Sequence, residues 1–208
     1  MTAKLYCFGE SGNAYKAALT MALTGYDWEP VYVDFFHGES RSPEFRALNE
    51  MGEAPVFVEG DLTLTQSCVI QLHIAEKTGK LIDGDRNEIL RWLFWDAQKG
   101  SGQQGALRFL MNFVPEDRRP EQAIGWLGAR VLSSIKMLDT HLEGRDWVAG
   151  DAPTIADTAC CGYLYYPEPF GFDRKAWPHI DAWLDRIAAL PGWKHPYELM
   201  PGNPSDRA

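Results

Sequence analysis

The chain has 208 residues, of which 45% are hydrophobic and 12% aromatic, enough apolar side chains for a folded protein with a buried core. Its net charge of -9 is spread along the sequence without a cluster of lysines and arginines, which argues against nucleic acids and anionic membrane surfaces as partners. The four cysteines, Cys7, Cys68, Cys160 and Cys161, show neither a CxxC pair nor zinc-ligand spacing, so we expect reduced thiols, no metal site and no disulfide framework.

No apolar run is long enough to cross a membrane, and the first residues lack a basic segment followed by an apolar signal region. We therefore expect a cytoplasmic protein that does not bind membranes.

Residues 5–35 predict a strand, a helix and a second strand. The apolar run Leu5–Phe8 is the first strand. The following apolar residues have helical spacing: Ala14, Ala17, Ala18, Met21 and Ala22. Gly25 ends this helix, and Val31, Val33 and Phe35 alternate as a strand does. A strand, helix and strand of this length predict a parallel, right-handed crossover.

Residues 42–79 predict a short helix, a hairpin and a longer helix. Ser42 and Pro43 are typical of an N-cap and a first helical position, which starts a helix that runs to Leu48. The apolar segments 56–58 and 62–64 flank a tight turn, which predicts an antiparallel hairpin. A helical pattern then runs from Ser67 to near Gly79.

A polar, glycine-rich segment at residues 81–85 is the predicted linker between two domains. Strand patterns disappear after it, and long helical patterns follow at residues 86–113, 120–143, 154–166 and 178–190. Gly100, Gly102 and Gly105 predict a break or bend within the first of these patterns. The expected fold is therefore a βαβ-ββα domain with a mixed sheet over residues 1–80 and an all-helical domain over residues 86–208.

Two local features of the first domain predict a binding site for a small anionic peptide. Pro55 starts a strand and has no backbone N–H to donate. We therefore expect the N–H and carbonyl of the residue before it to be exposed at a sheet edge, where a peptide can pair with them. The helix that starts at Gln66 and Ser67 offers free N–H groups to a carboxylate.

Six segments in this order give the chain its resemblance to the glutathione transferase superfamily. They are Leu5-Tyr6 with Ser11–Lys16, Ser42–Phe45, Leu48-Asn49, Ala54-Pro55, Gln66-Ser67 and Thr154–Asp157. The resemblance spans nearly the full length and implies a thioredoxin-like first domain and a helical second domain. It also implies an active site of the serine type, similar to those of theta-like and bacterial members. It also implies glutathione as co-substrate, without a further cofactor.

The resemblance assigns roles to the residues of the peptide site. It implies a cis peptide bond between Ala54 and Pro55, with the backbone of Ala54 pairing with the cysteinyl part of glutathione. Gln66 and Ser67 resemble the pair that holds the γ-glutamyl end, although Ser67 also fits a plain N-cap.

Ser11 lies where serine-type relatives have their catalytic hydroxyl, which donates a hydrogen bond to the glutathione sulfur and favours its thiolate form. Asn13 is a second donor to the sulfur, a residue that holds Ser11 in place, or the N-cap of the first helix. Tyr6 and Cys7 compete for the catalytic role because other classes use those residue types nearby. Both lie inside an apolar run, however, so core packing explains them better.

The match fails at the residues expected to bind the glycyl carboxylate of glutathione. Ser40 and Glu53 stand where relatives often carry a basic residue or a histidine. Glu53 would repel a carboxylate if it faced the ligand. We therefore expect either that Glu53 points away from the ligand, or that Arg41, His37 or Lys16 supplies the positive charge. Thr154 and Asp157 form a Thr-x-x-Asp capping box, whose expected role is in folding.

The expected second substrate is a small hydrophobic electrophile. An aromatic and apolar set in the helical half suits such a ligand and equally suits core packing: Trp92, Phe94, Trp95, Leu107, Phe109, Met111 and Phe113.

The leading hypothesis is a homodimeric glutathione transferase of the detoxification type, which conjugates glutathione to the electrophile. The alternatives are a glutathione-dependent isomerase, dehalogenase or peroxidase on the same fold, and a non-catalytic ligand-binding or interaction protein.

Overall fold

The structure, a computed structural model, describes residues 2–202 and 204. Within this part, the chain forms two compact units, residues 2–80 with 191–202 and 204, and Leu81–Leu190. The sequence analysis assigned everything after the linker to the helical domain. In the structure, residues 191–202 instead belong to the first unit, because they pack against its first helix and its sheet.

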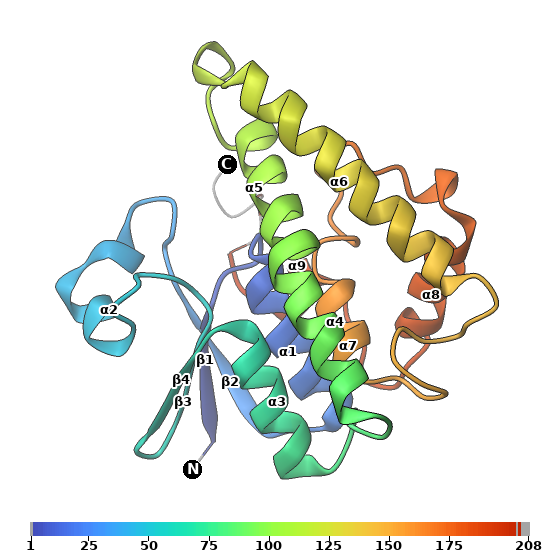
Figure 1. The fold of residues 1–208 in the computed structure, drawn as a ribbon. Coiled ribbons are helices and arrows are strands. Elements are labelled where there is room, and N and C mark those ends of the chain that lie inside the picture. Colours follow the sequence, from blue (N-terminus) through green and yellow to red (C-terminus); the bar gives the residue numbers. More distant parts are fainter. Residues whose placement is uncertain (1, 203, 205–208) are drawn as a thin grey trace. The chain divides into compact units, whose positions relative to one another are not determined.

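The first unit contains a four-stranded mixed sheet, which has the predicted thioredoxin-like arrangement (Figure 1). Its strands are β1 (Ala3–Cys7), β2 (Trp28–Tyr32), β3 (Val56–Glu59) and β4 (Leu62–Thr65), in the spatial order β2-β1-β3-β4. The β1–β2 pair is parallel, as the crossover helix between them requires, whereas β3 pairs antiparallel with both β1 and β4.

The two faces of this sheet bury different residues because side chains alternate along a strand. Leu5 and its cross-strand partner Phe57 are fully buried, and the Phe57 ring lies 5.7 Å from the ring of His73 in the third helix. Tyr6 and its partner Val56 face the other way and pack with Phe45. The sheet is therefore covered on both faces.

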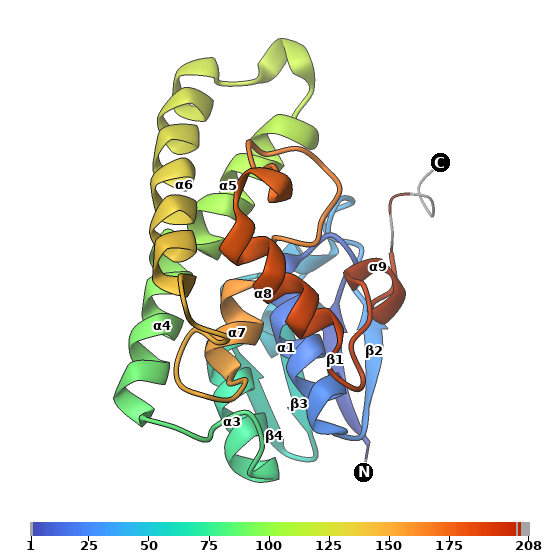
Figure 2. The same ribbon diagram turned by 90° about the vertical axis from the view of Figure 1, so that its right-hand side faces the viewer.

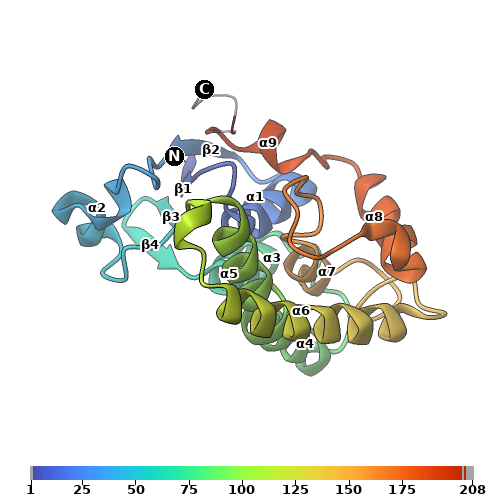
Figure 3. The same cartoon turned by 90° about the horizontal axis from the view of Figure 1, so that it is seen from above.

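The helices of the first unit are α1 (Gly12–Thr24), α2 (Pro43–Leu48), α3 (Ser67–Thr78) and α9 (Pro196–Leu199), with a 3₁₀ helix at Glu39–Arg41. α1 and α3 pack against each other, and α2 lies on the opposite side of the sheet (Figure 3). Gly25 and Gly79 end α1 and α3 in the left-handed conformation, at φ 70° and 65°, as predicted. Ser42 caps α2 through a 3.1 Å bond from the N–H of Phe45, also as predicted.

The second strand lies earlier than the sequence analysis placed it. β2 covers Trp28–Tyr32, whereas the alternating residues had indicated Val31 to Phe35. Pro30 lies inside the strand, and proline normally argues against a strand. Here it is tolerated because β2 is at the edge of the sheet and pairs with β1 alone.

The second unit is helical, with α4 (Arg86–Lys99), α5 (Ser101–Asn112), α6 (Glu121–Leu142), α7 (Ile155–Cys160) and α8 (Pro178–Ala188), and 3₁₀ helices at Glu116–Arg118 and Arg174–Ala176. The predicted break falls at Gly100, between α4 and α5. Asp96 accepts a 3.1 Å bond from the N–H of Ser101, and a Cβ at Gly100 would lie 2.6 Å from the Asp96 carboxylate. Only glycine leaves room for this cap.

The third helical pattern is shorter than expected. α7 ends at Cys160, and turns follow where the sequence had indicated helix up to residue 166. The predicted capping box is confirmed: the Thr154 hydroxyl accepts from the N–H of Ala156 at 3.2 Å, and Asp157 accepts from the N–H of Thr154 at 2.8 Å. Asp157 also accepts from the indole N–H of Trp183 at 2.8 Å, so it links α7 to α8.

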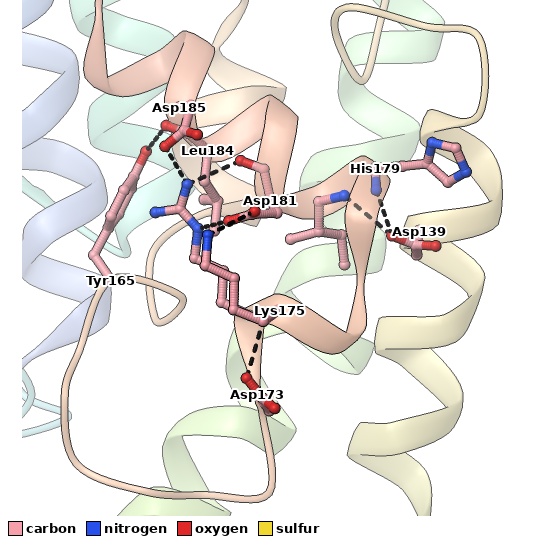
Figure 4. A network of polar contacts seen from close by, with 10 residues as sticks. Asp139, Tyr165, Asp173, Lys175, His179, Asp181, Leu184 and Asp185 are labelled. Carbon is pink, nitrogen blue, oxygen red and sulfur yellow. Dashed lines mark hydrogen bonds and ion pairs between the residues drawn. The ribbon is translucent and has the colours of Figure 1, made fainter.

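α8 begins without a side-chain cap of its own, and α6 supplies one. Asp139 accepts from the N–H groups of His179 and Ile180 at 3.0 and 3.1 Å (Figure 4). Arg174 forms ion pairs with Asp181 and Asp185, which hold the preceding 3₁₀ helix against α8 (Figure 4). The two bonds to Asp139 satisfy free N–H groups at the helix terminus.

Candidate functional site

Ser11 is the N-cap of α1 and lies in the short loop between β1 and that helix. Its hydroxyl oxygen accepts a 3.1 Å bond from the N–H of Ala14, and its own N–H donates to the carbonyl of Phe8 at 3.0 Å. The residue is 8% exposed, and these two bonds hold it in place. Since the described side chains and backbone use the oxygen only as an acceptor, its O–H is left to donate to a ligand.

The position of Ser11 favours an anion beside it. The aligned peptide dipoles of α1 give its N-terminus a partial positive charge, which an acidic side chain in the first turn would oppose. The first turn of α1 contains no acidic residue. A thiolate that accepted a hydrogen bond from the Ser11 hydroxyl would therefore be stabilised by the partial positive charge of this helix terminus.

The alternative assignment of Asn13 as N-cap is wrong. Asn13 is the second residue of α1, and the cap belongs to Ser11. The sequence did contain a signal for this, because an N-cap serine precedes the first apolar position of the helix, Ala14, by three residues. Asn13 is partly exposed, next to Ser11.

Tyr6 and Cys7 belong to the core, as the sequence analysis favoured. The ring of Tyr6 packs edge-on against Phe45 with 6.4 Å between centroids. Cys7 is fully buried, and loss of solvation raises the pKa of its thiol to about 12. A thiol that stays protonated in the interior is not a nucleophile, so neither residue competes with Ser11.

The peptide bond between Ala54 and Pro55 is cis, as the resemblance implied. The expectation that Pro55 opens an edge strand is wrong, because β3 lies between β1 and β4. The pairing of β3 starts only at Val56, however. Ala54 therefore lies beyond the paired part of the sheet, and within the described residues its N–H and carbonyl make no hydrogen bond. Its backbone groups are open to an extended peptide.

Gln66 and Ser67 lie at the start of α3, as predicted, but Ser67 is not the cap. The cap position is Gln66, whose side chain does not cap the helix, and Ser67 is the first helical residue, 7% exposed. Gln66 has φ 68°, a left-handed conformation that costs a residue other than glycine about 1–3 kcal/mol and that recurs at ligand sites. This uncapped terminus is suited to an anion.

Glu53 does not point away from this region. The amide nitrogen of Gln66 lies 3.4 Å from the Glu53 carboxylate and 3.3 Å from the sulfur of Met51. Glu53 is exposed, so its negative charge lies beside the start of α3, where the carboxylate of a peptide would bind. This acidic group opposes anion binding at the same terminus.

The three candidate cations differ in their surroundings. Lys16 is fully buried in α1. His37 is exposed and pairs with Asp34, with 2.8 Å between Nδ1 and the nearer carboxylate oxygen. Arg41 is exposed at the end of the 3₁₀ helix before α2, and within the described residues it has no ion pair. Of the three, Arg41 is the one whose charge is available to a ligand.

The aromatic set of the helical half does not form a single apolar pocket. Trp92 and Leu107 are fully buried core residues, whereas Phe94 is 75% exposed. A cavity of about 240 Å³ does lie in this unit. It is lined by Trp95, Lys99, Gln103, Arg130, Ser133, Ser134 and Met137. Its two cationic residues do not match a purely hydrophobic ligand.

Among residues 2–202 and 204, no group of three or more histidine, cysteine or acidic side chains is arranged to hold a metal ion. No helix in this part of the chain is both long and apolar enough to span a membrane.

Comparison with known proteins agrees with the fold. Residues 1–76 match the family model of the glutathione S-transferase N-terminal domain, and residues 108–191 match that of the C-terminal domain. Glutathione S-transferase F10 of Arabidopsis thaliana is 30% identical over 88% of this chain and 90% of its own. A maleylacetoacetate isomerase of Pseudomonas aeruginosa is 27% identical over 98% of both chains. The crystal structure of a glutathione S-transferase from Xanthobacter autotrophicus Py2 covers 95% of this chain and 98% of its own, with 34% identity and a TM-score of 0.86. The chain belongs to the glutathione S-transferase family.

Proposed function

We propose that this protein activates the thiol of glutathione for conjugation to a small hydrophobic electrophile. The observation that carries the proposal is the Ser11 hydroxyl. It is fixed by the N–H of Ala14 at the start of α1 and keeps its O–H available for a ligand.

Ser11 acts as a hydrogen-bond donor and not as a base or a nucleophile. An ordinary thiol has a pKa near about 8.5 and is mostly protonated at neutral pH. The Ser11 hydroxyl and the N-terminus of α1 favour its anion, and a shift of about two pKa units requires about 2.7 kcal/mol of preferential stabilisation. Asn13 adds a second donor or restrains Ser11. The bound thiolate then attacks an electrophile held beside it.

Glutathione binds along the backbone of Ala54 and the start of α3. The peptide groups of Ala54 pair with the cysteinyl residue, and the terminus at Gln66 and Ser67 receives the α-carboxylate of the γ-glutamyl residue. Arg41 holds the glycyl carboxylate, since its charge is exposed and without an ion pair among the described residues. Glu53 lowers the affinity of this site.

A second candidate is a glutathione-dependent isomerase. The Pseudomonas aeruginosa relative named maleylacetoacetate isomerase matches 98% of both chains, which favours this reading. Isomerisation, dehalogenation and peroxide reduction would start from the same activated thiolate. They differ from conjugation in the second substrate and in the fate of glutathione, which isomerisation regenerates and which peroxide reduction oxidises to its disulfide with a second glutathione. A substrate panel of an aryl halide, a cis-configured unsaturated diacid and an organic hydroperoxide separates them.

The test of the proposal is the ultraviolet absorbance of the thiolate of bound glutathione as a function of pH, in the native protein and in Ser11→Ala. We expect the bound thiol to have a pKa well below that of free glutathione, and the substitution to raise it. Binding without a shift in either protein would contradict the role of Ser11. Absence of binding would favour a non-catalytic ligand-binding or interaction protein.

We further propose that the protein is a homodimer. Phe94 on α4 and Trp126 and Leu132 on α6 are 75%, 62% and 51% exposed, and large exposed apolar side chains are typical of interaction surfaces. Sedimentation equilibrium measures the mass. We expect a dimer for the native protein and a monomer for Trp126→Glu, and a native monomer at micromolar concentration would contradict the proposal.

We place the protein in the cytoplasm, in agreement with four free cysteines. The proposed reaction needs glutathione as co-substrate and no further cofactor.

A further inference from the structure

The chain returns to the first unit after its helical part. Residues 194–202, here called the C-terminal strap, contain α9 and lie beside α1 and β2 (Figures 2 and 3). Pro196 and Met200 of the strap are buried, so it is packed into the unit. Nothing in the local sequence of the strap predicts this contact.

The strap touches the loop that carries Ser11. The N–H of Gly9 donates to the carbonyl of Pro201 at 2.6 Å. A Cβ at Gly9 would lie 2.9 Å from the carbonyl oxygen of Gly202 and 3.1 Å from the ring of Tyr197. The two backbones are therefore in direct contact, two residues before the proposed hydrogen-bond donor.

Two further contacts fix the strap on either side of this bond. At its start, the hydroxyl of Tyr15 donates to the carbonyl of Lys194 at 2.9 Å, and the N–H of Tyr15 bonds to the carbonyl of Ser11 at 2.9 Å. At its end, Gly202 has φ 77°, and a Cβ there would come within 2.2 Å of the Tyr32 ring. Tyr32 pairs with Cys7, the last residue of β1 before the loop.

We propose that the C-terminal strap positions the Ser11 hydroxyl for the glutathione sulfur, with Gly9, Pro201 and Tyr15 as positioning residues. The inference rests on the proposed role of Ser11 as thiolate donor. A hydrogen bond weakens steeply when its angle departs from linearity, so a loop that shifts by a few tenths of an ångström stabilises the thiolate less well. The strap restrains the loop through the two elements that flank the loop. It bonds to Tyr15 of α1, and it contacts Tyr32, which pairs with the last residue of β1.

The chain provides a matched pair of glycines to separate positioning from general stability. Gly202→Ala places a methyl group against Tyr32, next to the Ser11 loop. Gly192→Ala introduces the same kind of conflict, since Gly192 has φ 93° and its Cβ would lie 2.6 Å from the carbonyl oxygen of Ala22. Ala22 lies in α1 about 15 Å along the helix from Ser11. Tyr15→Phe is a milder variant that removes the bond to Lys194.

The experiment uses the full chain and two measurements. The first is the pKa of bound glutathione from thiolate absorbance, in the native and Ser11→Ala backgrounds. The second is hydrogen exchange of the peptide that contains residues 8–12. We expect Gly202→Ala and Tyr15→Phe to raise the thiol pKa by about one unit, a tenfold loss in the thiolate-to-thiol ratio, and to speed exchange of this peptide. Gly192→Ala should lower the unfolding temperature without either effect.

Three results would overturn the proposal. One is an unchanged exchange rate and thiol pKa in both Gly202→Ala and Tyr15→Phe. Another is an equal effect of Gly192→Ala. The third is a pKa change that persists in the Ser11→Ala background, since the strap would then act by another route. If native protein does not bind glutathione, the proposed function fails, and the exchange measurement still decides whether the strap orders the loop.

Discussion

The hydroxyl oxygen of Ser11 accepts a hydrogen bond from the N–H of Ala14 at 3.1 Å, so this side chain caps α1. Accepting a hydrogen bond polarises a hydroxyl and makes it a better donor. In the proposed function, the contact that starts the helix therefore also prepares Ser11 to stabilise a thiolate. The proposal predicts that stability and activity are coupled at this residue.

Ser11→Ala should lose both roles. We expect a loss of about 1 kcal/mol in the free energy of unfolding for the cap and a fall of about 100-fold in kcat/KM for the donor. Ser42→Ala is the matched control, because Ser42 caps α2 through a bond of the same length, 3.1 Å, to Phe45. It should lose similar stability and keep its activity. Equal losses of activity in the two variants would mean that Ser11 acts through folding alone.

Glu53→Gln should strengthen glutathione binding. The carboxylate lies 3.4 Å from the Gln66 amide at the start of α3, and removing its charge removes repulsion of the peptide carboxylate. We expect a decrease in Kd of about twofold to fivefold at low salt, which shrinks as salt is added. Asp61→Asn, in the exposed β3–β4 turn at the other end of the hairpin, is the control and should leave Kd unchanged. Weaker binding by Glu53→Gln would instead assign Glu53 to the ammonium group of glutathione.

Arg41→Gln should weaken the binding of glutathione by about threefold to tenfold. The glycyl ethyl ester of glutathione identifies the group that Arg41 contacts, because the ester lacks that carboxylate. Calorimetry should show weaker binding of the ester to native protein and no further loss in Arg41→Gln. Lys4→Gln removes one exposed cation from the far end of β1 and should have no effect. An additive loss from the ester and the substitution would rule out this contact.

Cys7 should be the thiol most resistant to alkylation in the folded protein. Burial raises its pKa to about 12, so almost none of it is thiolate at about pH 8. Cys68 is partly exposed and should react first, as peptide mapping by mass spectrometry can determine. The Cys7→Ala variant should still bind glutathione with the pKa of the glutathione thiol lowered, as the native protein is expected to do. Loss of that effect with the fold intact would return Cys7 to the catalytic site.

His141 should make the helical unit sensitive to acid. Its ring lies against Trp92 with 4.4 Å between centroids and 49° between the ring planes. Nε2 lies 2.9 Å from the carbonyl oxygen of Val148, to which it donates when Nε2 carries the ring hydrogen. Burial lowers the pKa of His141 below 6.5. In the unfolded chain His141 has its ordinary pKa. As the pH falls below that value, the unfolded chain binds more protons than the folded chain, so acid reduces the free energy of unfolding.

His141→Gln removes that titration and can keep a donor to Val148. Urea denaturation at about pH 7 and pH 5 should show a smaller loss of stability in the variant than in the native protein. An equal loss in both proteins would assign the acid sensitivity to other groups.

Local patterns determined most of the elements and the residues of the site. Caps and breakers act within a few residues, so Ser42-Pro43, Gly79 and the Thr154–Asp157 box could be interpreted from sequence alone. The same holds for the break at Gly100 and for the family, whose short motifs lie at fixed positions along the chain.

Tertiary structure decided what depends on contacts between distant segments. Pro30 is compatible with a strand because β2 is an edge, which no local pattern states. The charge of Glu53 lies beside Gln66 because the fold brings those atoms together. The bond from Gly9 to Pro201 joins residues almost a whole chain apart. Helix periodicity and capping are local properties of a sequence, whereas such contacts follow from the global packing of apolar surface, which no short window contains.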